Sequence, residues 1–203
     1  KNKKSCSMSL IGTTSFFPSK PLGCYGDGGA CFTNNKDLEN KIRAIKNHGG
    51  IKRFQHKYIG LNGRLDTIQA VVANYKLKNK LDNITKKRIR NSKMLDKYLA
   101  KNKNIILVKR KRYLKEVFHL YHINVKKRDE LQKYLISKNI DAKVHYPIPV
   151  HLQKAAKYLK YKKGDFPVAE KLAKTSISLP VHEFISSREI YHMVKEINKF
   201  FNI

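Results

Sequence analysis

The stretch that decides the fold is residues 14–29, which read TSFFPSKPLGCYGDGG. Small and apolar residues lead into it from position 9, and two prolines, Pro18 and Pro21, interrupt the extended run. The Gly-Asp-Gly-Gly sequence that closes it is typical of a tight turn, after which an extended run resumes and ends near Thr33. The pattern predicts two buried strands joined by a constrained loop, with Lys20 as the cation of that loop.

Lys20 is the residue of this loop that could carry chemistry. An amine held away from water loses stabilisation of its charge, so its pKa falls and the neutral form can attack a carbonyl to make a Schiff base. Ser15 lies five residues earlier, where a hydroxyl could contact a phosphate. From the residues alone, a surface lysine in a loop is the simpler interpretation, because the chain has 35 lysines.

The segments that follow the loop alternate in their expected structure. A helix is expected from about Asp37 to a stop at Gly49-Gly50, followed by a polar loop over 51–63. A longer helix is expected from Arg64 to about Leu99, with or without a break. Its apolar stripe consists of Leu65, Ile68, Val72 and Tyr75.

The second half of the chain continues this alternation. Strands are expected at 105–108, 120–125, 142–146 and 176–180. Helices are expected at 129–138, 165–175 and 187–201, the last with a clean apolar stripe. Alternating strands and helices predict an α/β domain in which helices cover a sheet.

The charge balance is strongly basic, with 44 Lys and Arg against 15 Asp and Glu and a net charge of +29. Such a balance is expected of a nucleic-acid-binding protein. Only nine of the basic residues are Arg, the side chain that reads guanine and forks onto phosphate, so a solvated lysine-rich surface is favoured. The densest run, between Lys76 and Lys93, lacks interleaved aromatic residues. A basic nucleic-acid-binding module remains the alternative from another class.

Several classes of protein are excluded by pattern. No apolar run approaches the roughly 18–20 residues of a membrane span, and no apolar stretch follows the basic N-terminus as in a signal peptide. The three cysteines form no C-x-x-C pair, and the scattered histidines form no ligand array, so no metal site is predicted. The thiols are expected to be reduced in a cytoplasmic protein.

Six segments, taken in order, resemble one known family. The segment from Ser15 to Gly29, with Lys20 near its centre, looks like the lysine segment of the DegT/DnrJ/EryC1/StrS sugar aminotransferases. The matching order continues through four further stretches, at 47–49, 60–70 (GLNGRLDTIQA), 145–153 (HYPIPVHLQ) and 164–170. Leu179-Pro180-Val181-His182 matches the family's closing strand. The resemblance therefore covers nearly the whole chain.

The resemblance implies a fold and a domain plan. The expected fold is α/β, the C-terminal part of a pyridoxal-phosphate (PLP) dependent transferase of the aspartate aminotransferase type, fold type I. Residues 1–63 would end the large PLP-binding domain, 64–100 would form a connecting long helix, and 101–203 would form the small C-terminal α/β domain. The upstream elements that hold the cofactor in the family are not among these residues. We therefore expect a piece of a longer chain that is inactive alone.

The resemblance also implies the cofactor-binding residues. Lys20 would hold PLP covalently and then move a proton at the amino donor, which makes it the catalytic residue. Ser15 matches a hydroxyl that contacts the PLP phosphate. Asn62 matches an amide that reaches the phosphate in the neighbouring subunit, which implies a homodimer with shared active sites.

Substrate-binding positions follow in the same way. Arg64 would project toward the substrate, where its planar fork suits a carboxylate. His145 and Tyr146 match positions that line the sugar pocket, although a His-Tyr-Pro sequence at a strand end can also be purely structural. Within the family, the motifs look closest to the enzymes that aminate a UDP-linked 3-keto-2-acetamido-hexuronate with L-glutamate as donor. Their products enter surface polysaccharides such as lipopolysaccharide O-antigen. Another UDP- or dTDP-linked ketosugar is the alternative substrate.

Overall fold

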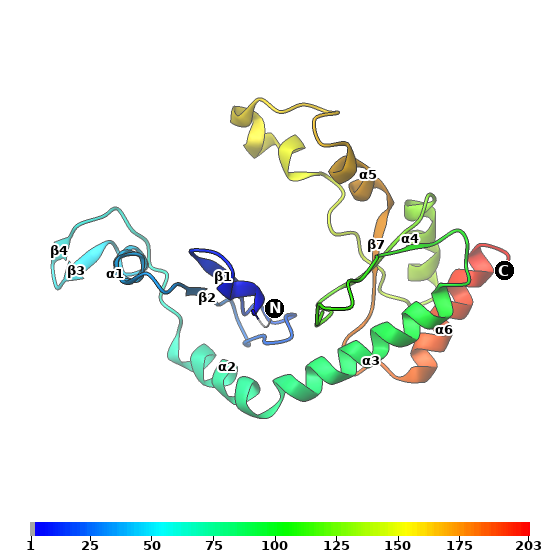
Figure 1. Cartoon of the computed structure of the whole chain (residues 1–203), viewed down its shortest axis with the longest axis horizontal. Helices are drawn as coiled ribbons and strands as arrows, with labels where there is room; N and C mark the ends of the chain where they lie inside the picture. Colours follow the sequence, from blue (N-terminus) through cyan, green and yellow to red (C-terminus); the bar gives the residue numbers. More distant parts are fainter. Residues whose placement is uncertain (1–2) are drawn as a thin grey trace. The chain divides into compact units, whose positions relative to one another are not determined.

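The computed structural model describes residues 3–203, and the chain divides into two compact units, Lys1–Asp82 and Asn83–Ile203 (Figure 1). The first unit is built from two small hairpins and two helices, and it also has a short 3₁₀ turn, η1, at Ser5–Ser7. The second unit is built around a three-stranded sheet. Both contain the expected mixture of strands and helices, so the α/β fold class is confirmed.

The first hairpin brackets the loop that carries Lys20. Strand β1 (Gly12–Ser15) pairs antiparallel with β2 (Gly29–Phe32), with Ser15 opposite Gly29 at the mouth of the loop. The expected strand–loop–strand order is therefore confirmed. The expectation that both strands are buried is wrong for this unit, because the pair forms a two-stranded sheet and most of its side chains are exposed.

Helix α1 (Lys36–Ile45) follows, and its start has a clear chemical cause. The side chain of Asn35 accepts a hydrogen bond from the backbone N–H of Leu38, and two acidic residues occupy the first turn. The helix ends ahead of Gly49, whose φ of +77° lies in the left-handed region. A Cβ there would also overlap the carbonyl oxygen of Tyr58, so only glycine fits this position.

The segment expected as a plain loop over 51–63 contains a second hairpin. Strand β3 (Gly50–Lys52) pairs antiparallel with β4 (Gln55–His56), with an irregularity in the register between Gly50 and Lys52. The strands are too short and polar for a periodicity argument to detect. The correction matters because this hairpin surrounds a cavity described below.

The helical segment expected from Arg64 to about Leu99, with or without a break, consists of two helices. Helix α2 (Thr67–Asn79) begins three residues later than expected, and α3 (Leu81–Leu99) follows a break at Lys80. The predicted stripe on α2 is wrong as a buried face, because Ile68 and Tyr75 are 69% and 56% exposed. Apolar residues lie all around this helix, so no single stripe defines an inner side.

The second unit has an antiparallel sheet in the order β5-β6-β7. The strands are β5 (Ile106–Leu107), β6 (Tyr121–Asn124) and β7 (Ser176–Leu179). The segment expected as a strand at 142–146 contributes only one bridge, between Lys143 and Ser178. The remaining elements are helices α4 (Arg128–Ser137), α5 (Pro167–Thr175) and α6 (Ser187–Phe200) and the 3₁₀ turns η2 (Val150–Leu152) and η3 (Lys154–Leu159).

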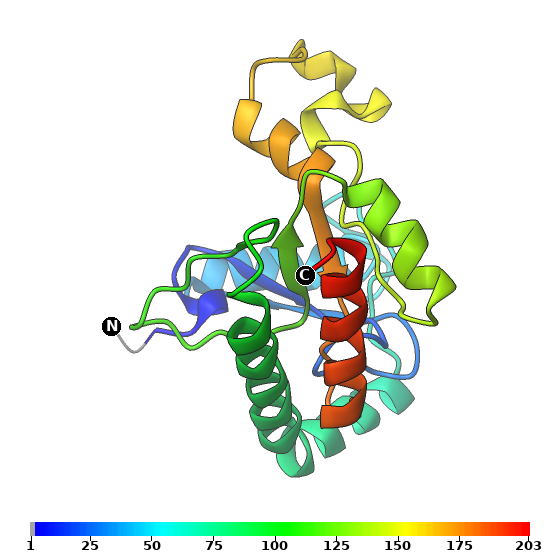
Figure 2. The same ribbon diagram turned by 90° about the vertical axis from the view of Figure 1, so that its right-hand side faces the viewer.

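The core of this unit lies between the sheet and three helices, α3, α4 and α6 (Figure 2). Tyr121 and Ile123 alternate inward along β6, while His122 between them points to the other face. Helix α6 begins with a capping box in which Ser186 and Glu189 each satisfy the other's backbone N–H. The fully buried members of the core include Leu95, Leu99, Leu131, Leu135, Ile177, Ile190, Met193 and Ile197.

A buried ion pair fixes α3 within this unit. The guanidinium of Arg88 lies 2.9 Å from the carboxylate of Glu183 and also donates to the carbonyl oxygens of Phe118 and His119. One turn later, Asn91 donates to the carbonyl oxygen of His182 at 2.8 Å. Arg88 and Asn91 are themselves buried, so losing these partners would leave a buried guanidinium or amide unpaired.

Within residues 3–203, no helix combines the length and the apolar composition needed to cross a membrane.

Two neighbouring residues on α4 test the position of the core. Leu135 is fully buried and Ile136 is 55% exposed. We expect Leu135→Ala to lower the free energy of unfolding of this unit by about 2–5 kcal/mol, because the substitution leaves a cavity. Ile136→Ala, the matched control, should change it by no more than about 0.5 kcal/mol. Urea titration followed by circular dichroism measures both, and equal effects would contradict the assigned core.

Candidate active site

The Lys20 loop folds back on itself through backbone hydrogen bonds. The N–H of Lys20 donates to the carbonyl oxygen of Phe17 at 2.9 Å, and the N–H of Cys24 donates to Phe16 at 2.7 Å. A Cβ at Gly23 would overlap the Pro18 carbonyl oxygen, which shows how tightly the two sides of the loop approach. Lys20 is half-buried. Its backbone is therefore held in one conformation.

Helix α2 contacts this loop through Gln69 and Lys76. The Oε1 atom of Gln69 accepts hydrogen bonds from the backbone N–H groups of Tyr25 at 2.9 Å and Gly26 at 3.0 Å. The thiol of Cys24 donates to the backbone oxygen of Gln69 at 3.3 Å. The Nζ atom of Lys76, two turns later, donates to the Gly23 carbonyl oxygen at 2.5 Å. The lysine segment and the GLNGRLDTIQA segment, distant in sequence, therefore meet in this unit.

Ser15 occupies the end of β1, next to the mouth of the loop. Its Oγ atom accepts a hydrogen bond from the N–H of Phe17 at 3.2 Å, and the residue is exposed. The hydroxyl proton remains able to donate to an external oxygen atom. The geometry suits a hydroxyl that contacts an anionic ligand.

Asn62 and Arg64 lie together. The Nε atom of Arg64 donates to Asn62 Oδ1 at 3.1 Å, and its Nη1 donates to Asn47 Oδ1 at 3.3 Å. An isolated antiparallel bridge pairs the backbones of Asn47 and Asn62. The three side chains are exposed, so two amides orient a guanidinium at the surface of the first unit.

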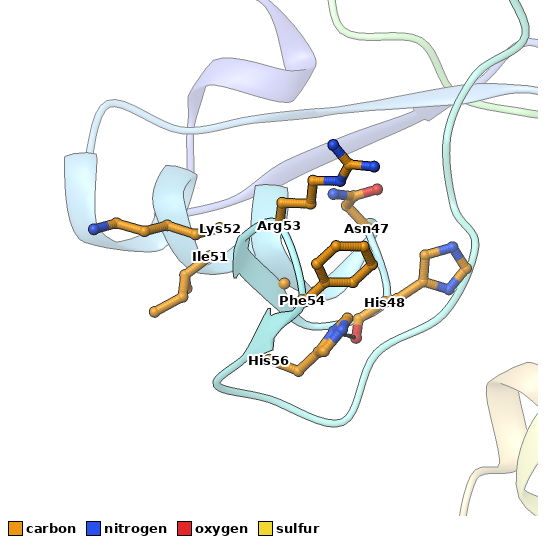
Figure 3. Close-up of a pocket in the computed structure, with 8 residues that line it drawn as sticks. Asn47, His48, Ile51, Lys52, Arg53, Phe54 and His56 are labelled. Carbon is orange, nitrogen blue, oxygen red and sulfur yellow. Dashed lines mark hydrogen bonds between the residues drawn. The ribbon is translucent and has the colours of Figure 1, made fainter.

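A cavity of about 260 Å³ lies beside these residues, within the β3–β4 hairpin (Figure 3). The Nδ1 atom of the His56 ring lies 3.0 Å from the carbonyl oxygen of His48. The guanidinium of Arg53 stacks 5.0 Å from the centre of the Phe54 ring. The lining residues are Asn47, His48, Gly50, Ile51, Lys52, Arg53, Phe54 and His56.

The sequence prediction did not include this cavity. Lys52, Arg53 and His56 lie in the segment that the sequence predicts to be a polar loop over 51–63. Their grouping between Gly50 and Gly60 is a signal that could have been noticed, because a basic cluster in a glycine-bounded segment is typical of anion contacts. Gln69 was within a quoted motif, but only the structure shows its contacts with the loop.

The two remaining predicted residues lie in the second unit. The Nδ1 atom of His145 lies 2.8 Å from Ser178 Oγ, and its ring lies 5.4 Å, centre to centre, from that of Tyr146. Tyr146 is 73% exposed and His145 is half-buried. Four predicted site residues are thus in the first unit and two in the second. Over the part of the chain described, no three His, Cys, Asp or Glu side chains form a group suited to a metal ion.

Comparison with known proteins is consistent across sequence and structure. The DegT/DnrJ/EryC1/StrS aminotransferase family matches residues 1–198. A protein of Geobacillus stearothermophilus named pleiotropic regulatory protein is 39% identical over 198 residues, covering 96% of this chain and 52% of the relative. The UDP-2-acetamido-2-deoxy-3-oxo-D-glucuronate aminotransferase of Pseudomonas aeruginosa is 36% identical over 192 residues, which cover 94% of this chain and 52% of that relative.

Among solved structures, S. venezuelae DesV in complex with a ketimine intermediate is similar with a TM-score of 0.87 and 32% identity. The match covers 94% of this chain and 51% of that one. The chain belongs to the DegT/DnrJ/EryC1/StrS aminotransferase family. It spans about half the length of the curated relatives it matches.

Gln69 offers a direct test of how the lysine loop is held. In Gln69→Ala, the N–H groups of Tyr25 and Gly26 lose their acceptor, so we expect their opening free energy to fall by about 1–3 kcal/mol. Amide hydrogen exchange measures this as faster exchange at these two residues. Gln69→Glu retains an acceptor oxygen and serves as the control. Unchanged exchange in the alanine variant would contradict the contact.

Proposed function

We propose that the protein containing this chain is a PLP-dependent aminotransferase of a nucleotide-linked ketosugar. The observation that carries the proposal is the Lys20 loop, fixed by its own backbone and by Gln69 of the neighbouring helix. A nucleophilic amine on a preorganised loop is what a covalently bound cofactor requires. The family match over residues 1–198 supports the same activity.

The residues of this loop fit PLP. The lysine has a fixed backbone and a half-buried position, and Ser15 keeps a hydroxyl proton for a phosphate oxygen. When bound, PLP supplies a ring that withdraws electrons from the bond broken at the Cα atom of the amino donor. Lys20 would hold the cofactor through Nζ. Once released, the same Nζ atom would take the proton from the donor Cα and deliver it during transfer.

Arg64 supplies recognition of a carboxylate. Its Nε and one terminal nitrogen are engaged by Asn62 and Asn47, which orients the planar group while leaving further N–H groups to donate. L-Glutamate and a hexuronate both carry carboxylates. Asn62 would contact the cofactor phosphate of a second subunit, which makes the proposed enzyme a homodimer with shared sites. His145 and Tyr146 would line the sugar pocket.

The substrate we favour is a UDP-linked 3-keto-2-acetamido-hexuronate, with L-glutamate as amino donor. The support is the 36% identity to the Pseudomonas aeruginosa protein whose name specifies a UDP-linked 3-oxo-glucuronate. The basic lining of the hairpin cavity, with Lys52 and Arg53, suits the diphosphate of a nucleotide sugar. Such a product would enter surface polysaccharide, including lipopolysaccharide O-antigen. Another UDP- or dTDP-linked ketosugar remains the alternative substrate.

A domain plan accompanies this function. We infer that residues 1–63 belong to the large cofactor-binding domain, 64–100 to a connecting helical segment, and 101–203 to the small domain. Exposed apolar side chains on α2, including Val71 and Leu77, support a larger assembly around the first unit. A helix that is apolar all round is stable only when covered on more than one side.

The basic run at 76–93 is better explained by structure than by nucleic-acid binding. Lys76 donates to the lysine loop and Arg88 is buried against Glu183, so the run is not one continuous solvated face. A nucleic-acid platform would need these cations on one side with aromatic rings between them. We therefore infer that most of these cations are solvated at the surface, and that Lys76 and Arg88 make the two structural contacts described above.

The decisive experiment concerns Lys20. Borohydride reduction of the intact protein should fix PLP to Lys20, which peptide mass spectrometry detects. Lys20→Ala should lose the label and slow amino transfer by about 10²–10⁴-fold, because no group remains to move the proton. The exposed Lys154, replaced by alanine, is the control and should change neither. Labelling at a different lysine would end the proposal.

A second experiment concerns Arg64. We expect Arg64→Lys to raise the KM for L-glutamate or for a hexuronate substrate about tenfold, because a lysine cannot make the forked contact with a carboxylate. Steady-state kinetics with each substrate varied in turn measures the effect. Arg112→Lys, at an exposed position, is the matched control. Unchanged KM values for both carboxylate substrates would remove Arg64 from the site.

A further inference from the structure

A short segment of the second unit, residues 144–151 (VHYPIPVH), is attached to the rest of that unit at both ends, and we call it the strap. Next to its first end, Lys143 exchanges two backbone hydrogen bonds with Ser178 of β7, at 2.7 and 3.0 Å. At its second end, the ring of His151 in η2 contacts a carboxylate of α5. Tyr146, a predicted site residue, therefore lies between two attachments.

One carboxylate oxygen makes the second attachment. Oε1 of Glu170 lies 3.1 Å from Nε2 of His151 and accepts a hydrogen bond from the backbone N–H of Gly164 at 2.7 Å. The side chains of Glu170 and His151 are only 12% and 8% exposed. The His151 ring also lies 4.7 Å, centre to centre, from the ring of Phe166. Polar groups removed from water need such partners, so this contact is costly to break.

The electrostatics of the contact agree with an ionised carboxylate. The backbone N–H of Gly164 contributes most to lowering the pKa of the Glu170 carboxyl, burial opposes it, and the His151 ring lowers the pKa further. An ionised carboxylate oxygen has more than one lone pair, so it can serve the amide and the imidazole together. The strap and the turn at 162–165 are therefore joined to α5 through the same side chain.

Packing between the strap and α5 is incomplete, which makes this polar contact more important. A cavity of about 180 Å³ lies between them. The strap lines it with Pro147, Ile148 and Pro149. Helix α5 lines it with residues that include Ala173 and Lys174. Dispersion contacts are lost where a void replaces neighbouring atoms, so the attachments have a large part in setting the position of the strap.

The strap is stiff between its attachments. Proline rings fix φ at positions 147 and 149, and each proline restricts the residue before it, here Tyr146 and Ile148, to extended backbone. Four consecutive residues thus have little conformational freedom, and η2 begins directly after them. A displacement at His151 would therefore be passed on to Tyr146 rather than absorbed between them.

Tyr146 depends on this stiffness because burial does not hold it. The residue is 73% exposed. Its ring lies edge-on to that of the neighbouring His145, which belongs to the same strap. The location of the Tyr146 ring therefore follows the backbone that carries it.

We propose that Glu170 and His151 are positioning residues that fix the strap, and through it the ring of Tyr146, for contact with the nucleotide-linked sugar. The inference rests on the proposed function, in which Tyr146 lines the sugar pocket. A phenol both donates and accepts hydrogen bonds, so it suits the hydroxyl and carbonyl oxygens of a pyranose. Holding the ring in place before the substrate arrives lowers the ordering cost of binding.

The anchor can be tested without any substrate. In the intact protein, Glu170→Ala removes the acceptor of Gly164 and the partner of His151. Amide hydrogen exchange should therefore become about three- to tenfold faster at Gly164 and at Leu152 in η2. Glu130→Ala, at an exposed position on α4, is the matched control and should change neither rate. Unchanged exchange at Leu152 in Glu170→Ala would overturn the anchor.

A double-mutant cycle tests whether the anchor acts through Tyr146. In the intact enzyme, Glu170→Ala should raise the KM for the ketosugar about three- to tenfold and leave the KM for L-glutamate unchanged. In a Tyr146→Ala background, Glu170→Ala should add less than about twofold, because the ring that it positions is already absent. Equal effects in the two backgrounds would overturn the positioning role, because a purely structural effect does not depend on the ring.

Two further variants keep the test independent of folding. Glu170→Gln retains an acceptor oxygen and should return the KM for the ketosugar to within about twofold of the unmodified enzyme. His151→Ala breaks the contact from the strap and leaves the hydrogen bond of Gly164 in place. It should couple to Tyr146→Ala in the same way, and it decides the question if Glu170→Ala does not fold.

The outcomes separate this inference from the proposed function. Faster exchange at Leu152 in Glu170→Ala, in an intact protein without aminotransferase activity, would overturn the function while the anchor stands. Aminotransferase activity with additive effects in the cycle would overturn the action of the anchor on Tyr146 and leave the function intact.

Discussion

The first unit depends on one side-chain oxygen. Gln69 Oε1 receives the N–H groups of Tyr25 and Gly26, and so joins the loop that bears Lys20 to the first turns of α2. The strands that bracket the loop form only a two-stranded sheet, and Cys24 within the loop is buried. These hydrogen bonds therefore help to set the position of the loop that bears the lysine. The contacts of Lys76 and Cys24 strengthen the same junction.

Sequence patterns predicted the elements whose boundaries have a local chemical cause. The end of α1 a few residues before Gly49, whose φ is positive, and the apolar stripe of α6 belong to this group, because both are properties of a few consecutive residues. The β3–β4 hairpin was missed because two- and three-residue strands carry too little periodicity. A break between Arg64 and Leu99 was left open by the sequence, but its position at Lys80 could not be found because the helical pattern continues through it. The prediction of a buried face on α2 was wrong because burial depends on what covers a helix, and the residues of the helix do not encode that.

In the candidate site too, features of a local segment could be predicted from the sequence and tertiary contacts could not. Lys20, Ser15, Asn62 and Arg64 could be found because they lie in recognisable segments, and they remain predictions of role. The partners that orient Arg64 and His145 could not be found this way. Asn47 lies 17 residues from Arg64, and Ser178 lies 33 residues from His145, so their meeting is a product of tertiary folding. Orientation of a site residue is therefore the information that the sequence alone does not supply.

The uneven distribution of apolar burial has a consequence for the order of folding. The second unit has a contiguous core of large side chains, whereas the buried apolar residues among 3–82 are Cys24, Ala44 and Ala73. A nucleus needs mutually supporting hydrophobic contacts, and a lone two-stranded ribbon is at best marginally stable in water. The second unit should therefore collapse first and act as the early-folding part of the chain. The first unit, which carries the reactive lysine, would acquire its structure after that core has formed.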